Sequence, residues 1–142
     1  MGLHGGEWRV HASAVDDTTL IVDSMQWLCG DSVEISIERE KSALGAIMYT
    51  IVGKMNSKAS KESLGRVCND SLKEILSNGI ASRVDDNKNL HIRLGLASLV
   101  RGEAVVAGLS GSPVAKGKFK LEVYPGQEAA SVAESVIAKM VD

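Results

Sequence analysis

The 142-residue sequence has few aromatic residues, two prolines and two cysteines. Aromatic side chains make up 4% of the chain, so we expect an aliphatic core and few rings for stacking on unpaired bases. Cys29 and Cys68 lie far apart, without a CxxC spacing or a nearby histidine. This pattern excludes a zinc knuckle and a disulfide framework, and it predicts two reduced, buried thiols.

Long apolar runs are also missing. No segment reaches the roughly 18 apolar residues that a membrane-spanning helix needs. The first residues, MGLHGG, lack the charged and then apolar order of a signal peptide. We therefore expect a cytoplasmic protein without a membrane partner.

Motifs of catalysis and metal binding are absent from the sequence as well. It contains neither GxSxG nor HExxH, and the segment GSPVAKGK at 111–118 fails the spacing of a phosphate-binding loop. The paired carboxylates at 16–17 and 85–86 suit a helix cap and a turn. The three histidines have no metal-ligand spacing. We predict a protein that is not an enzyme, with no catalytic residues, no metal and no cofactor.

What is present is an ordinary globular composition, with 44% hydrophobic and 24% charged residues. We expect residues 1–142 to form a single domain, of which residues 1–6 are flexible. Alternating apolar residues predict strands, and apolar residues at three- and four-residue steps predict helices. The predicted strands are 7–15, 33–38, 47–55, 90–94, 104–109 and 118–123; the predicted helices are 18–29, a long helix over 57–78, a short one within 95–102, and 129–141.

This order, β-α-β-β-α-β-(short helix)-β-β-α, predicts the α+β class. Short turns between neighbouring strands favour a mostly antiparallel sheet with the helices packed on one face.

Two groups of cations are candidates for binding RNA, although the formal net charge is −2. Lys54, Lys58 and Lys61 cluster around the start of the long predicted helix, where free amides favour a phosphate. A solvated lysine face is the alternative interpretation. The second group exists only if two predicted strands lie side by side; its members are His91, Arg93, Lys116, Lys118 and Lys120.

The segments VHASAVDD, LGAI, LHIRLGLASLVRGEAVVAG and KFKLEVYP follow one another along the chain, and together they resemble an archaeal family of exosome-associated RNA-binding proteins. VHASAVDD resembles the family's His-Ala-Thr-Glu segment through His11 and Ala12, and LGAI resembles its Gly-Asn-Pro-Ile turn. LHIRLGLASLVRGEAVVAG and KFKLEVYP resemble its closing segment; the matching residues are Arg93, Gly102, Glu103, Tyr124 and Pro125.

This resemblance implies a fold similar to double-stranded-RNA-binding domains and to the ribosomal protein that binds 5S RNA. It also implies RNA and exosome subunits as partners. The family's Asp-Lys-Gln is replaced here by residues 95–97, and its Thr-Glu by Ser13 and Ala14. We therefore keep two hypotheses: a non-catalytic RNA-binding protein that contacts phosphates through a lysine patch, and an adaptor or homodimeric scaffold that has lost RNA binding.

Overall fold

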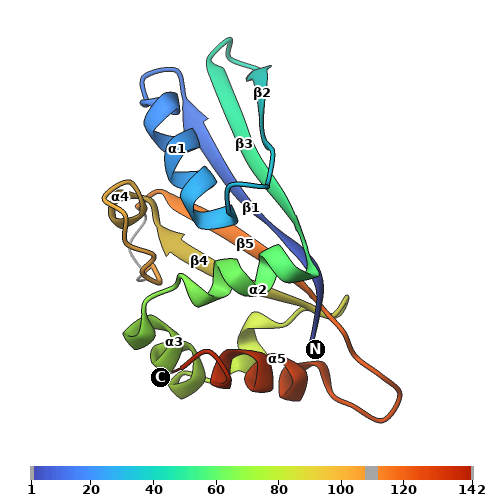
Figure 1. Cartoon of the computed structure of the whole chain (residues 1–142). Helices are drawn as coiled ribbons and strands as arrows, with labels where there is room; N and C mark the ends of the chain where they lie inside the picture. Colours follow the sequence, from blue (N-terminus) through green and yellow to red (C-terminus); the bar gives the residue numbers. More distant parts are fainter. Residues whose placement is uncertain (1, 108–111, 142) are drawn as a thin grey trace.

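The computed structural model describes residues 2–107 and 112–141, and Figure 1 shows its strands and helices. In chain order they are β1 (Leu3–Ser13), α1 (Thr18–Cys29), β2 (Ile35–Lys41), β3 (Ile47–Asn56), α2 (Ser57–Gly65), α3 (Asn69–Ser77), the 3-10 helix η1 (Ile80–Arg83), β4 (Asn89–Gly95), α4 (Leu96–Leu99), β5 (Val114–Leu121) and α5 (Ala129–Ala138).

The strands form one antiparallel sheet in the order β2-β3-β1-β5-β4. Figure 1 shows α1 and α2 lying across the same face of this sheet, with α3 and α5 beyond its β4 side. The α+β class and the antiparallel sheet are confirmed. The central strand β1 comes from the N-terminal end of the chain, and its neighbour β5 comes from the C-terminal third.

Trp8 on β1 occupies the centre of the core, between the sheet and α2. Its ring is fully buried, and its Nε1–H donates to Ser63 Oγ of α2 at 2.7 Å. Phe119 of β5 meets this ring edge to face, with the centroids 5.3 Å apart. Gly117 leaves room for the ring, because a Cβ there would lie 2.5 Å from Trp8 Cζ3. The core is otherwise mostly aliphatic, but its two largest fully buried side chains are aromatic.

The long helix expected over 57–78 is broken into α2 and α3. After Gly65 the chain leaves the helix, and the backbone N–H of Cys68 donates to the carbonyl of Ala104 at 2.9 Å. Val67 pairs with Ala104 as an isolated parallel bridge. The apolar spacing continued through this break because both helices pack on the same core, so periodicity alone did not reveal it.

The prediction of a strand at 104–109 is wrong for residues 104–107, and its last two residues lie outside the described part. Ala104 and Val106 each form only an isolated bridge, to Val67 and to Leu94. The next strand, expected over 118–123, is shifted toward the N-terminus, because β5 begins at Val114 and ends at Leu121.

The glycine-rich start, expected to be flexible over residues 1–6, instead contributes Leu3–Gly6 to β1. Leu3 is 1% exposed, and the ring of Phe119 fills the space beside Gly6, where a Cβ would lie 2.5 Å from Cδ1. The expected ends of two other elements also shift, since β2 runs to Lys41 and α5 ends at Ala138. No helix in residues 2–107 and 112–141 has the length and apolarity that crossing a membrane requires.

Candidate nucleic-acid interface

One face of the sheet carries the helices, and the other is open to solvent. Side chains alternate between the two faces along each strand. On β1, Trp8 and Val10 point into the core, so Glu7 and Arg9 point to the opposite side. We call this side the open face and define it by the outward residues of β1, β3, β4 and β5.

The strand register places the predicted cations of β3, β4 and β5 in rows across the open face. Lys54 is opposite Glu7, Glu7 is opposite Lys118, and Lys118 is opposite His91. Neighbouring strands lie about 4.7–4.9 Å apart, so these four side chains form a continuous row. In the next row Arg9 is opposite Lys116, which is opposite Arg93. The second predicted group of cations therefore comes together, and Lys54 joins it.

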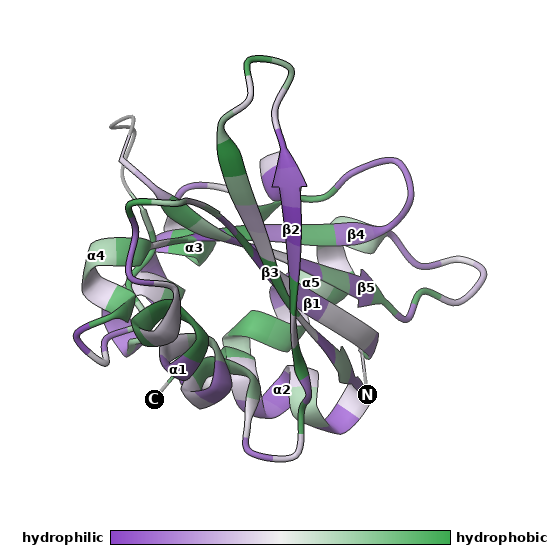
Figure 2. Ribbon diagram, turned by 90° about the horizontal axis from the view of Figure 1, so that it is seen from above, coloured by the Kyte–Doolittle hydropathy of each residue, from purple (hydrophilic) through white to green (hydrophobic). Residues whose placement is uncertain are grey.

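The open face is strongly cationic although the whole molecule is slightly acidic. On β1, β3, β4 and β5 its outward positions hold one carboxylate, Glu7, which pairs with Arg9 at 3.1 Å. The edge strand β2, largely hydrophilic in Figure 2, adds Glu38 and Glu40 on the same side, opposite Thr50 and Met48 of β3 and away from β4 and β5. No ion pair joins its lysines to a carboxylate among the residues that the structure describes. The six guanidinium and ammonium groups of the face belong to Arg9, Lys54, Arg93, Lys116, Lys118 and Lys120.

The turn between η1 and β4 fixes one side of this face. Asp85 Oδ2 lies 2.7 Å from His91 Nε2, and Asp85 Oδ1 accepts the backbone N–H groups of Asn87 and Asn89. These hydrogen bonds, that with His91 first, hold the pKa of Asp85 far below its usual range. Lys120 Nζ donates to the carbonyl of Asn87 at 2.6 Å. His91 and Lys120 are therefore positioned by the turn.

The first predicted group of lysines is divided between the two sides of the sheet. Lys54 extends from the open face, whereas Lys58 and Lys61 lie on α2, which packs against the inner face. The side chain of Asn56 caps α2 by accepting the N–H of Ala59 at 2.8 Å. Lys61 also lies near enough to Glu122 to contribute to that carboxyl group's lowered pKa. These three lysines therefore do not lie together at the N-terminus of α2.

All five aromatic side chains lie away from the open face. Trp8 and Phe119 are in the core, and Tyr49 is on the inner side of β3. Trp27 belongs to α1, and Tyr124 follows β5. The open face thus presents cations, Glu7, hydroxyl and amide groups and aliphatic side chains rather than a platform for stacking bases.

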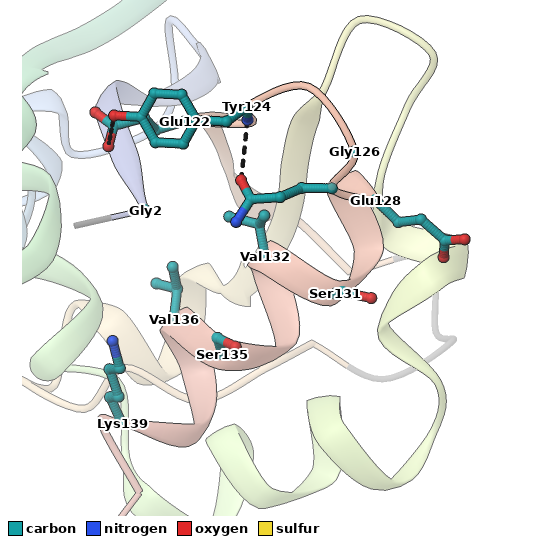
Figure 3. Close-up of a pocket in the computed structure, with 11 residues that line it drawn as sticks. Gly2, Glu122, Tyr124, Gly126, Glu128, Ser131, Val132, Ser135, Val136 and Lys139 are labelled. Atoms are coloured by element: carbon teal, nitrogen blue, oxygen red, sulfur yellow. Dashed lines mark hydrogen bonds between the residues drawn. The ribbon is translucent and has the colours of Figure 1, made fainter.

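A further hollow lies between α5 and the segment that follows β5 (Figure 3). It measures about 630 Å³. Tyr124 donates its hydroxyl to Glu122 Oε1 and its backbone N–H to Gln127 Oε1, both at 2.9 Å. The bond to Tyr124 lowers the pKa of Glu122, and the bond to Glu122 raises that of Tyr124. With Glu122 and Glu128 against Lys139 alone, this hollow does not suit a polyanion.

Metal-binding groups are not assembled in the described ranges, where no cluster of three or more His, Cys, Asp or Glu side chains could hold an ion. His11 contacts Thr50 Oγ1 at 3.3 Å on the open face, and His4 lies 3.7 Å from Glu122. Neither contact creates a site of its own.

The structure adds one cation that the sequence did not single out. Arg9 lies on the central strand, and its Nε is buried without a hydrogen-bond partner. The alternation of residues 7–15 already placed Arg9 on the polar side of its strand. That pattern could not show that β1 is the central strand of the sheet. Arg9 lies in the middle of the cations because β1 is central.

The fold is similar to solved structures of archaeal DUF54 proteins. A DUF54 protein from Methanothermobacter thermautotrophicus superimposes with a TM-score of 0.73 over 100% of both chains, at 18% identity. A second, from Archaeglobus fulgidus, has a TM-score of 0.78 at 20% identity, over 94% of this chain and 99% of that one. A third, from Sulfolobus solfataricus, has a TM-score of 0.73 at 14% identity, over 96% of each chain. At these identities the likeness establishes the fold.

Sequence comparison identifies the family. No curated protein matches the sequence. The family model described as RNA binding matches residues 7–109, which include β1 from Glu7 onward, β2 to β4 and helices α1 to α4. Because this match spans well over half of the chain, the protein belongs to the RNA-binding family that this model describes.

Proposed function

We propose that the chain binds RNA through the open face and acts as a binding protein rather than as an enzyme. The family supports RNA as the partner. The observation that carries the choice of surface is the register that brings the cations of β1, β3, β4 and β5 together. A cationic patch on a slightly acidic body is able to hold a polyanion by replacing its counterions.

The arrangement favours contacts with phosphates. Lys116, Lys118 and Lys120 alternate along β5 and point to the same side, about 6–7 Å apart along the strand. Phosphate contacts hold a nucleic acid in place but do not read its sequence. Since the aromatic side chains lie elsewhere, we infer that the chain recognises structured RNA by its shape and its phosphates.

A titration monitored by fluorescence polarisation tests this proposal. A labelled RNA hairpin and an unpaired RNA of the same length are titrated with the protein between about 50 and 200 mM salt. We expect the hairpin to bind more tightly, with an affinity that falls steeply with salt. Replacing Lys116 by Ala should weaken binding for every sequence and reduce the salt slope by about 1.

Lys58 provides the matched control, since it is an exposed lysine of the helical layer. Lys58→Ala should leave affinity and salt slope unchanged. The proposal is wrong if no salt-dependent binding occurs in the micromolar range. It is also wrong if Lys58→Ala weakens binding as much as Lys116→Ala does.

We also propose, on the resemblance of the sequence motifs, that the chain associates with subunits of an archaeal exosome. Capture of those subunits from an archaeal lysate, with and without nuclease, tests this association. Loss of the subunits after nuclease treatment would indicate that RNA bridges them to this chain.

An adaptor or homodimer is the alternative, and the hairpin of β2 and β3 favours it. Figure 1 shows this hairpin extending beyond the helices. Leu44 at its turn is 98% exposed, and Ile37 on the edge strand β2 is 49% exposed. Light scattering decides whether the chain is a dimer, and Ile37→Lys should abolish a dimer formed there. Protein partners that survive nuclease would favour the adaptor over the RNA-binding protein.

A further inference from the structure

The open face contains a depression of about 350 Å³ around Gly5 of β1. We call it the glycine notch. Its lining residues come from four strands and are Gly5, Gly6, Glu7, Lys54, Met55, Asn89, Lys118 and Lys120. Three of the lining residues are therefore lysines: Lys54 of β3 and Lys118 and Lys120 of β5.

The notch exists because an outward position of the central strand has no side chain. Gly5 is opposite Asn56 of β3 and Lys120 of β5. A Cβ at Gly5 would lie 2.9 Å from the carbonyl oxygen of Met55, which is closer than side chains normally approach. The pairing of β1 with β5 also shifts its register between Leu3 and Gly5. The close approach of β3 to β1 thus requires glycine at position 5. Because glycine has no side chain, a depression remains there.

The charges around the notch suit a compact anion. Lys54 and Lys118 flank Glu7 from the two neighbouring strands, and Glu7 is held by Arg9 at 3.1 Å. Lys120 uses one N–H on the carbonyl of Asn87. An ammonium group has three donors, so Lys120 keeps two for a ligand. Three cations therefore surround the hollow against one carboxylate that is already paired.

We propose that the glycine notch binds one phosphate group of the RNA. This inference rests on the proposed function and adds a fixed point to it: one phosphate is bound in the notch, while the other cations of the open face contact the RNA on either side. Lysine is suited to this role because it acts as a point charge with several donors. The phosphate belongs either to the chain interior of the RNA or to a 5′ end.

Inorganic phosphate tests the notch without RNA. We expect saturable shifts of the Gly5 and Gly6 amide resonances when phosphate is added, and none with chloride at the same ionic strength. Lys118→Ala should weaken this binding about tenfold, the effect of losing a hydrogen bond to a charged group. Lys116→Ala is the matched control, because Lys116 lies on the same strand and face but outside the notch.

Two results would overturn the proposal: no saturable shift beyond that of chloride, or equal weakening by Lys116→Ala and Lys118→Ala. The amide spectrum of each variant also shows whether it is folded. A hairpin RNA with and without a 5′-phosphate then identifies the source. Tighter binding of the phosphorylated RNA assigns the notch to the terminus, and equal binding that Lys118→Ala weakens more than Lys116→Ala does assigns it to an internal phosphate. If phosphate shifts the notch but no RNA binds, the proposed function fails independently.

Discussion

Gly117→Ala tests the position of Trp8, on which the packing of the central strand depends. An added Cβ would lie 2.5 Å from Trp8 Cζ3 and 2.8 Å from Cε3 and Cη2. The ring has little freedom to move away, because Ser63 Oγ accepts its N–H and Phe119 packs against it. The methyl group must therefore displace either the ring or strand β5.

The expected loss of stability comes from two opposing contributions. Overpacking of a core costs about 1–3 kcal/mol. Replacing glycine by alanine reduces the freedom of the unfolded chain and stabilises by about 0.4–1 kcal/mol. We expect Gly117→Ala to lower the free energy of unfolding by about 0.5–2 kcal/mol, which for a chain of this size lowers the midpoint by a few degrees.

Urea denaturation followed by tryptophan fluorescence measures this change. Gly65→Ala is the control, because a Cβ at Gly65 meets no atom within 4 Å and the residue ends α2. This control should be stabilised by about 0.4–1 kcal/mol. The same substitution thus has opposite signs at the two sites. A Gly117→Ala variant as stable as the original would refute the packing of Trp8 over Gly117.

Three further predictions concern charge and chemistry. Because hydrogen bonds lower the pKa of Asp85, its carboxylate stabilises the folded state above the carboxyl's ordinary pKa near 4, and this stabilisation is lost as the pH falls. The difference in free energy of unfolding between the original protein and Asp85→Asn should therefore shrink in acid unfolding titrations. Burial raises the pKa of Cys29 to about 12, and a thiol reagent should modify the half-buried Cys68 first and Cys29 only on unfolding. Glu7→Gln should tighten RNA binding in polarisation titrations, because it removes the carboxylate of the open face and releases Arg9; weaker binding would show that Glu7 is needed to position Arg9.

Local patterns predicted most of the elements. The alternation in residues 7–15 and 47–55 identified β1 and β3, and the apolar stripe of residues 18–29 matched α1. The predictions were wrong where the backbone forms hydrogen bonds with a segment that is distant in the sequence. Residues 66–68 leave the helix to pair with Ala104, and no local signal shows that partner.

The candidate site was predictable in its residues but only partly in its grouping. His91, Arg93 and the lysines of β5 were recognisable as one set only on the condition that their strands pair, and β4 and β5 do pair. Lys58 and Lys61 were grouped with Lys54 because they are close in sequence. The chain passes from the sheet into the helical layer between them, so sequence distance was misleading there.

The sequence by itself determined the two faces of each strand and helix, because the side-chain periods of 2 and 3.6 residues are properties of the backbone. Only the tertiary structure decided which strands are neighbours, because that choice depends on how all the apolar faces are buried together. The order β2-β3-β1-β5-β4 brings Lys54, Arg9, Lys116 and Arg93 from four separate segments onto one surface. It also places Gly5 between lysines that are about 50 and 115 residues away along the chain.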